Sequence, residues 1–321
     1  MHTLTKRSMG QGSDERQKRL AALTIKSRPS VTKWVSFIFA VYLVIVCAEF
    51  FVFNESWKWG MVSQYLFSQR ILQGLLNTIV LTLVSTAIGL VLGLVTTWAR
   101  KSPLVVLRTL AGLYIWFIRA TPLLVILLLI FFLGALVPTL GIGVPFGPSL
   151  MEVPTNEVIT RFSAAVLGLS VYLGGKSAEV FRAGILAINS GQFEACKALG
   201  LSPWATYVKV IGPQAIRVIT PPMANEVITM FKNTSLVSVI GYTELLTTAQ
   251  LIYARNFETI PLLTVVVIWY LVLTSIAMYG QSRLEKRFGR GFDRRNHAEA
   301  KPLNVIAPEL SSVQGSTGGT R

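Results

Sequence analysis

The chain has 321 residues, of which 52% are hydrophobic and only 14% are charged, and its formal net charge is +15. Soluble globular proteins carry about 25% charged residues, so this composition excludes an ordinary soluble enzyme. A large positive charge indicates a nucleic-acid partner in a soluble chain, but here its distribution along the sequence indicates another origin.

Six apolar windows approach the length of about 20 residues that an α-helix needs to cross a membrane. The fifth window is the least regular, because Lys232, Asn233 and Thr234 interrupt it. The pattern predicts an all-α integral membrane protein with six transmembrane helices and both ends on the same side. The windows are 34–53, 75–97, 114–137, 162–180, 227–246 and 260–279.

Basic residues are spread unevenly over the segments between these windows. If the N-terminus is inside, the inner segments hold 23 of the 30 Lys and Arg residues and the outer segments hold 4. Positive residues concentrate on the cytoplasmic side of membrane proteins. The sequence therefore predicts cytoplasmic termini, and it explains the basic excess by topology. We expect membrane lipid around the chain and no nucleic-acid partner.

The two ends of the chain are polar. Residues 1–33 are predicted to be a basic cytoplasmic tail, followed by an N-terminal transmembrane helix over 34–53. The charged lead is too long for a signal peptide, and no small-residue cleavage site follows the apolar run. Residues 289–321 are predicted to be a disordered cytoplasmic tail because they end in a low-complexity stretch.

The second window and the segment after the third have distinct compositions. Gly89 and Gly93 recur at helical spacing in the second window. Small residues let membrane helices approach closely, so this window is predicted to pack tightly against another helix. Residues 138–161 are rich in Gly and Pro and are predicted to form an external loop on the membrane surface.

Ionisable groups inside membrane spans are costly, which makes them functional-site hypotheses. Arg119 precedes Thr121 and Pro122, where proline frees a carbonyl that the threonine can help to satisfy. Arg119 is a candidate to contact a substrate carboxylate or a glutamate of a partner helix. Equally, it could extend to a lipid headgroup.

Two further polar stripes lie on predicted helices. Lys176, Glu179 and Arg182 are three residues apart and share one helical face. A Lys176–Glu179 pair would lower the cost of burying both charges; alternatively, the stripe lines a transport path. Asn225, Glu226 and Lys232 form the second stripe, and transporters place binding sites in polar or broken helices near the midplane.

No cluster supports catalysis. The only histidines are His2 and His297, both in the predicted tails, which disfavours a metal site or a His-activated nucleophile. The segment 173–179 ends like a phosphate-binding loop, but Ser170 stands where that pattern requires glycine. Cys47 and Cys196 give no disulfide framework. We expect no catalytic residue, no metal and no cofactor bound by this chain.

Residues 191–213 form a polar segment between two apolar windows. Gln192 to Leu199 can form about two helical turns, and Gly200 can end them in a left-handed conformation. Ser202 can cap the next helix, with Pro203 in its first turn. A lipid-buried segment would not be this polar. The segment is therefore predicted to project into the cytoplasm and to meet water or another protein.

The spacing of this segment resembles the EAA loop of ATP-binding-cassette (ABC) importer permeases. Glu194-Ala195, Gly200 and Pro213 keep the places of that motif, whereas Cys196 replaces its third residue. The flanking stretches IRATPLL, AEVFRAGILAINSGQFEA and PPMANEVITMFKNTSLVSVIGYTELL resemble the polar amino-acid subfamily of these permeases. The resemblance spans 74–288, which it identifies as a type-1 permease domain.

The resemblance implies a type I importer permease core of five helices, with 34–53 as one additional N-terminal helix. It implies that Glu194, Ala195, Gly200 and Pro213 couple the chain to separate ATPase subunits. Glu179 and Arg182 match an E-x-x-R signature, for which gating or structural pairing is the favoured role. Lys232 belongs to a K-x-[TS]-S-L signature. The substrate-path candidates are Arg119, Thr121, Lys176, Asn225, Glu226 and Lys232.

The implied function is ATP-driven import of polar amino acids across a bacterial inner membrane. The implied partners are ABC ATPase subunits that use the ATP, a second copy of this permease or a homologous one, and an extracytoplasmic amino-acid-binding protein. Two alternatives stay open: an ion-coupled secondary amino-acid transporter or channel, and an integral-membrane enzyme, which the lack of a catalytic cluster disfavours.

Overall fold

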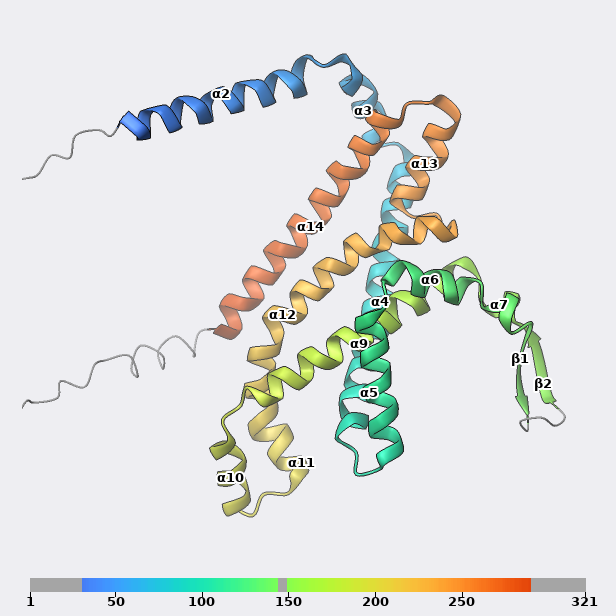
Figure 1. Cartoon of the computed structure of the whole chain (residues 1–321), viewed down its shortest axis with the longest axis vertical. Coiled ribbons are helices and arrows are strands. Elements are labelled where there is room, and N and C mark those ends of the chain that lie inside the picture. The colour runs from blue at the N-terminus through green and yellow to red at the C-terminus, as the bar shows by residue number, and fades with distance from the viewer. Residues whose placement is uncertain (1–30, 144–148, 290–321) are drawn as a thin grey trace, which may run out of the picture. The chain divides into compact units, whose positions relative to one another are not determined.

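The computed structural model of the chain describes residues 31–143 and 149–289, and most of them are helical. The predicted tails, 1–33 and 289–321, lie almost wholly outside the described residues, as do His2 and His297. The chain divides into two units, 1–57 and 58–321. Each unit is described by itself (Figure 1).

The first unit contains the predicted N-terminal span. Helix α2 runs over Val31–Phe53, and a short 3₁₀ turn, η1, follows at Glu55–Trp57. At 1.5 Å per residue, the 23 residues of α2 extend over about 35 Å, enough to cross a bilayer. The indole N–H of Trp57 donates to the Phe50 carbonyl at 3.1 Å and ties the end of α2 to the turn.

The second unit consists of helices and one β-hairpin. Its elements in chain order are α3 (Trp59–Leu66), α4 (Gln69–Lys101), α5 (Val105–Ala120), α6 (Leu123–Phe131), α7 (Leu133–Leu136), β1 (Thr139–Gly143), β2 (Ser149–Pro154), α8 (Thr155–Val158), α9 (Arg161–Leu186), α10 (Ser190–Ala198), α11 (Pro203–Ala205), η2 (Thr206–Ile211), α12 (Gly212–Asn233), η3 (Thr234–Ile240), α13 (Leu245–Asn256) and α14 (Thr259–Gly289).

Among the described residues, three straight helical segments are long and apolar enough to cross a membrane: 32–53, 69–101 and 259–287. Two bent pairs raise this to as many as five, namely α5 with α6, and 203–240 with α13. Helix α9 has 26 residues and is also long enough to cross a membrane, although it carries the charged residues of the fourth window. The predicted helical membrane fold is confirmed, with one β-hairpin as its only strands among the described residues.

The third and fifth predicted windows are not continuous helices. The chain turns by 111° between α5 and α6, inside the window 114–137. Proline disfavours a helical conformation at the residue before it, and Thr121 is extended, with φ −107° and ψ 133°. The fifth window is interrupted between η3 and α13, where Gly241 has φ +72° and the bend is 45°. The hydropathy of the sequence does not reveal either break, because both lie inside apolar windows.

Helix α4 packs along α9 through small residues, as predicted. A Cβ atom placed on Gly89 would lie 2.8 Å from the Cβ of Leu173, so only glycine lets the backbones come this close. The Thr97 hydroxyl donates to the Gly93 carbonyl at 2.7 Å and to the Ala178 carbonyl of α9 at 3.2 Å. This second bond links the two helices directly.

Two buried apolar clusters organise the unit. The first joins α4, α6, α9 and η3 and includes Leu81, Leu127, Leu169 and Val237. The second joins α3, α4, α13 and α14 and includes Val62, Ile71, Leu245, Leu262 and Val265. Helix α4 belongs to both clusters, so it forms the shared support of the unit.

The predicted external loop at 138–161 contains a β-hairpin. Strands β1 and β2 pair antiparallel, with a register shift between Ile142 and Gly143. The backbone N–H of Thr155 donates to the Pro138 carbonyl at 2.9 Å, and its hydroxyl donates to the Val137 carbonyl. These bonds close the base of the hairpin, which the Gly- and Pro-rich composition did not suggest.

Candidate functional site

The polar segment of the sequence folds into a short helical projection, residues 190–205, hereafter the α10–α11 projection. The side-chain oxygen of Asn189 accepts from the Gly191 N–H at 2.8 Å and caps α10. The Ser202 hydroxyl accepts from the Ala205 N–H at 3.2 Å and caps α11, whose first turn begins with Pro203. The predicted Ser202 cap and the place of Pro203 are thus confirmed, and the structure adds the Asn189 cap.

Gly200 makes the turn between the two helices. Its φ is +68°, in the left-handed region that favours glycine. The Leu201 N–H donates to the Cys196 carbonyl and the Gly200 N–H donates to the Lys197 carbonyl, each at 3.0 Å. This pair of bonds is a Schellman motif, which satisfies the last carbonyls of α10. The turn therefore has a fixed geometry that does not depend on packing against the rest of the unit.

The projection presents an open surface. Glu194 and Ala195 are exposed, whereas Cys196 beside them is buried. Leu199 and Trp204 are 77% and 69% exposed, and large apolar side chains this accessible on a polar segment are typical of a protein contact. Ala195 adds no bulk between its neighbours, which leaves space for a partner surface to approach closely.

Side chains connect the projection to the membrane helices. The Gln214 amide of α12 donates to the side-chain oxygen of Gln192 at 3.3 Å. Phe193 packs edge-on against Tyr207, with ring centroids 6.2 Å apart. The Lys101 ammonium, at the end of α4, lies 5.4 Å from the centre of the same Tyr207 ring. These contacts join α10 to α12 and, through Tyr207 of η2, to α4.

Pro213, the last predicted coupling residue, lies outside the projection at the start of α12. It follows η2, a π-helical segment over Thr206–Ile211. Proline has no N–H to donate to the preceding turn, and its ring crowds the carbonyl four residues earlier, so the helix widens here. The structure brings Glu194, Ala195 and Gly200 together and assigns Pro213 to the joint between projection and span.

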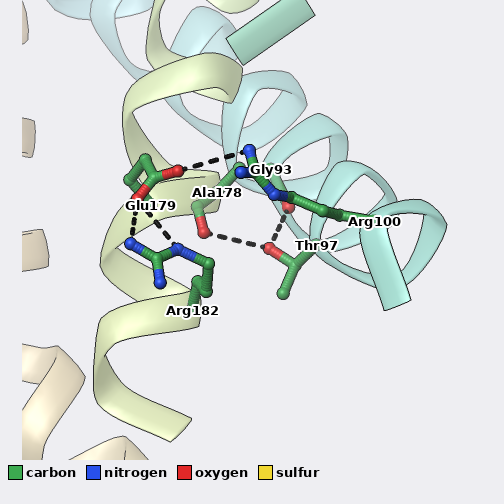
Figure 2. A network of polar contacts seen from close by, with 6 residues as sticks. All are labelled: Gly93, Thr97, Arg100, Ala178, Glu179 and Arg182. Carbon is green, nitrogen blue, oxygen red and sulfur yellow. Dashed lines mark hydrogen bonds and ion pairs between the residues drawn. The ribbon is translucent and has the colours of Figure 1, made fainter. Parts of the chain in front are cut away.

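A charged cluster joins α4 and α9 (Figure 2). The Glu179 carboxylate accepts from the Arg182 guanidinium at 2.7 and 3.0 Å, and the Arg100 guanidinium lies 3.6 Å from its other oxygen. The predicted Lys176–Glu179 pair is wrong. The Lys176 ammonium instead lies over the Tyr172 ring, 5.7 Å from its centre. Arg182 rather than Lys176 pairs with Glu179, because the planar guanidinium group donates to the carboxylate through two N–H groups.

Arg119 lies near this cluster, in the last turn of α5. Together with Arg100 and Glu179 it lines a hollow of about 410 Å³, whose apolar side includes Ile115 and Trp116. Two arginines and one glutamate thus line the hollow, and the positive excess among these charged residues suits a carboxylate ligand. Thr121 lies just beyond, at the bend between α5 and α6.

The second polar stripe does not join the cluster. Asn225 and Lys232 are exposed on α12 and Glu226 is half-buried. None of these three lines the hollow of Arg119. The hydroxyl of Ser235 donates to the Lys232 carbonyl at 2.7 Å, where α12 changes into η3. Of the six substrate-path candidates, Arg119 alone lines this hollow.

Sequence reasoning missed Glu244. This glutamate is fully buried at the start of α13, and its carboxylate accepts from the N–H groups of Leu246 and Thr247 at 2.9 and 2.7 Å. The hydroxyls of Thr247 and Tyr270 also donate to it, at 3.0 and 3.1 Å. The signal in the sequence was a lone acidic residue after Gly241 in an apolar window. Within 31–143 and 149–289, no group of His, Cys, Asp or Glu side chains could hold a metal ion.

Comparison with known proteins identifies the family. Residues 88–290 match the family described as "Binding-protein-dependent transport system inner membrane component". The chain belongs to this family. It is 38% identical over 289 residues to the arginine transport system permease protein ArgU of Corynebacterium glutamicum, which covers 88% of each chain. It is 35% identical over 178 residues to the glutamine transport system permease protein GlnP of Escherichia coli K12, which covers 55% of this chain and 74% of that one.

A solved structure supports the same conclusion. The crystal structure of an amino acid ABC transporter with histidines is similar to this chain with a TM-score of 0.60 and 31% identity, over 71% of this chain and 98% of that one. The permease is thus a multi-pass inner-membrane transport subunit with the type I fold, not an enzyme. Membership implies separate ATPase subunits and a binding protein in general. Membership in this family does not favour the alternative of an ion-coupled secondary transporter or channel.

Proposed function

We propose that this permease carries polar amino acids into the cytoplasm, powered by ATP that separate subunits hydrolyse. The observation that supports this most is the exposed, independently capped α10–α11 projection, in a chain whose relatives include arginine and glutamine permeases. The chain itself binds no nucleotide or other cofactor in this scheme. The α10–α11 projection and both termini are cytoplasmic, in keeping with the positive-inside distribution.

Two ATPase subunits bind two permeases, either two copies of this chain or this chain and a homologue. Glu194, Ala195 and Gly200 form the surface that enters the ATPase. When the ATPase pair closes, the displacement passes through Tyr207 to Lys101 and through Gln192 to Gln214. The spans α4 and α12 then move relative to their partners, which exposes the path to the opposite side.

At the inner end of α4, the hollow lined by Arg100 and Arg119 is the strongest candidate for contact with a substrate carboxylate. Glu179 and Arg182 hold each other in a pair at its edge, so we assign them a gating or structural role. Lys176, Thr121, Asn225, Glu226 and Lys232 remain candidates for the path on either side of this point.

The test is reconstitution of the permease with its ATPase and its binding protein in proteoliposomes. Uptake is measured with a labelled panel of arginine, histidine, glutamine and cystine, with leucine as the apolar comparison. We expect ATP-dependent uptake of at least one polar amino acid and little uptake of leucine. Uptake that persists without ATP but follows an imposed ion gradient would contradict the proposal. Cross-linking between two tagged copies distinguishes a homodimer from a heterodimer.

A further inference from the structure

Helix α13 lies at the end of the unit away from the α10–α11 projection (Figure 1). A second polar hollow lies between this helix and α4. Its volume is about 290 Å³. The residues that matter are polar ones from α4, from α13 and from the break before it: Arg70, Gln73, Asn77, Thr243, Thr248 and Arg255. We call this site the outer hollow, because the charge distribution assigns this end of α4 to the external side.

Close contacts between α4 and α13 frame the outer hollow. A Cβ atom on Gly74 would lie 2.5 Å from the Thr248 hydroxyl oxygen, so α4 and α13 are in close contact at its base. The Asn77 amide donates to the Thr243 carbonyl at 2.7 Å, one helical turn further along α4. The two helices therefore run antiparallel, which brings both Arg70 and Arg255 to the outer end of the hollow.

The two arginines are available for a ligand. Both are exposed, and no ion pair joins either of them to a carboxylate in the part of the chain that the structure describes. The nearby Lys58, by contrast, is paired with Glu258 at 2.6 Å. The predicted outer segments hold only four basic residues, and two of them line this one hollow. Two like charges held at one site repel each other unless an anion lies between them.

We propose that the outer hollow receives a carboxylate side chain of the extracytoplasmic amino-acid-binding protein, an inference that rests on the proposed function. A guanidinium fork matches a carboxylate through two parallel hydrogen bonds. A free amino acid fits less well, because no Asp or Glu lines the hollow to balance its ammonium group beside two guanidinium groups. The exposed arginines suit an acidic side chain that protrudes from a folded partner.

The experiment uses the reconstituted complex and the binding protein that supports its uptake. The variants are Arg70→Glu and Arg255→Glu, singly and together, with Arg161→Glu as the matched control. Arg161 is exposed on the same predicted side, at the start of α9, but does not line the hollow. We expect the double variant to need about tenfold more binding protein for half-maximal uptake, since interface charges govern encounter and register. The Arg161→Glu control should change the half-maximal concentration of binding protein less than twofold.

Two further measurements sharpen the test. Added salt should raise the half-maximal concentration for the unaltered complex and have little effect on the double variant, because the attraction being screened is gone. Replacement of individual surface acids of the binding protein by lysine should restore the affinity of the double variant at one position. If the charge-reversed variant assembles poorly, Arg70→Gln and Arg255→Gln remove the charges without adding repulsion.

Several outcomes would overturn the inference. An unchanged half-maximal concentration in all variants would exclude a role in docking. A lower maximal rate at saturating binding protein would instead indicate contact with the substrate. An effect seen only in vesicles with anionic lipid would assign the hollow to a phosphate headgroup. Absence of uptake by the unaltered complex would contradict the proposed function itself, which is a distinguishable result.

Discussion

The straight helix pair α4–α9 and the bent pairs of the same unit differ in construction: the first consists of unbroken helices, and the others are interrupted. Where α4 meets α9, small residues bring two unbroken helices into contact, and Thr97 bonds across them. Where α5 meets α6 and η3 meets α13, the chain changes direction at Pro122 and Gly241. In this unit the small-residue contact joins two unbroken helices, whereas at the bend before α13 the Glu244 carboxylate accepts from two backbone N–H groups.

The largest expected effect comes from breaking the straight pair. Gly89→Leu forces a side chain against the Leu173 Cβ, which would be 2.8 Å from the new Cβ. Overpacking of this kind costs about 2–3 kcal/mol, so the melting temperature of the purified permease should fall clearly. Gly280→Leu on α14 is the control, because a Cβ there meets nothing within 4 Å. Equal melting temperatures for both variants would refute the close α4–α9 contact.

The next effect comes from a bent pair. Glu244→Ala removes the acceptor for two backbone N–H groups and two hydroxyls at the start of α13. Leaving buried donors unsatisfied costs about 1–3 kcal/mol, so this variant should be less stable than the parent. Glu244→Gln keeps an oxygen acceptor and should lose less. Hydrogen exchange should quicken in α13 and remain slow in α4 and α9; uniform quickening would show that the bend is not an independent joint.

The α10–α11 projection offers a smaller and more local perturbation. Gly200→Val imposes a β-branched residue on a φ of +68°, at a cost of about 1–2 kcal/mol. Gly200→Asn is the matched variant, because asparagine tolerates this conformation. We expect the valine variant to insert normally but to lose most uptake and most ATPase binding, measured by co-purification. The asparagine variant should keep both. Full uptake by the valine variant would remove the projection from the coupling scheme.

The smallest effect distinguishes two pairings on α9. A double-mutant cycle with Glu179→Gln and Arg182→Gln should give a coupling free energy of about 0.2–1 kcal/mol, since the Arg182 side chain is partly exposed. The corresponding cycle with Lys176→Gln should give a value near zero. The measurement is thermal unfolding of the four proteins in each cycle. A larger coupling for Lys176 would restore the pairing that the spacing first suggested.

Local features were predictable from the sequence and long-range ones were not. The Ser202 cap, the place of Pro203 in the first turn of α11 and the turn at Gly200 depend on neighbouring residues only, so the pattern predicts them correctly. Lys176 and Arg182 are both three residues from Glu179, and the choice between them depends on side-chain shape and on Arg100 from another helix. The outer hollow combines Arg70 and Arg255, which are far apart in the sequence and come together only because α4 and α13 pack antiparallel.

Helix α4 has a consequence for communication between the two faces of the membrane. Its 33 residues form one rod of about 50 Å with no joint, from Arg70 at the outer hollow to Lys101 beneath Tyr207. One continuous helix therefore joins the outer hollow to the Tyr207 ring, which also contacts the α10–α11 projection. If a ligand at one end alters the affinity for a partner at the other, thermodynamic reciprocity requires the reverse effect by the same factor. In this view α4 relays binding at the outer hollow to the α10–α11 projection on the opposite side of the membrane.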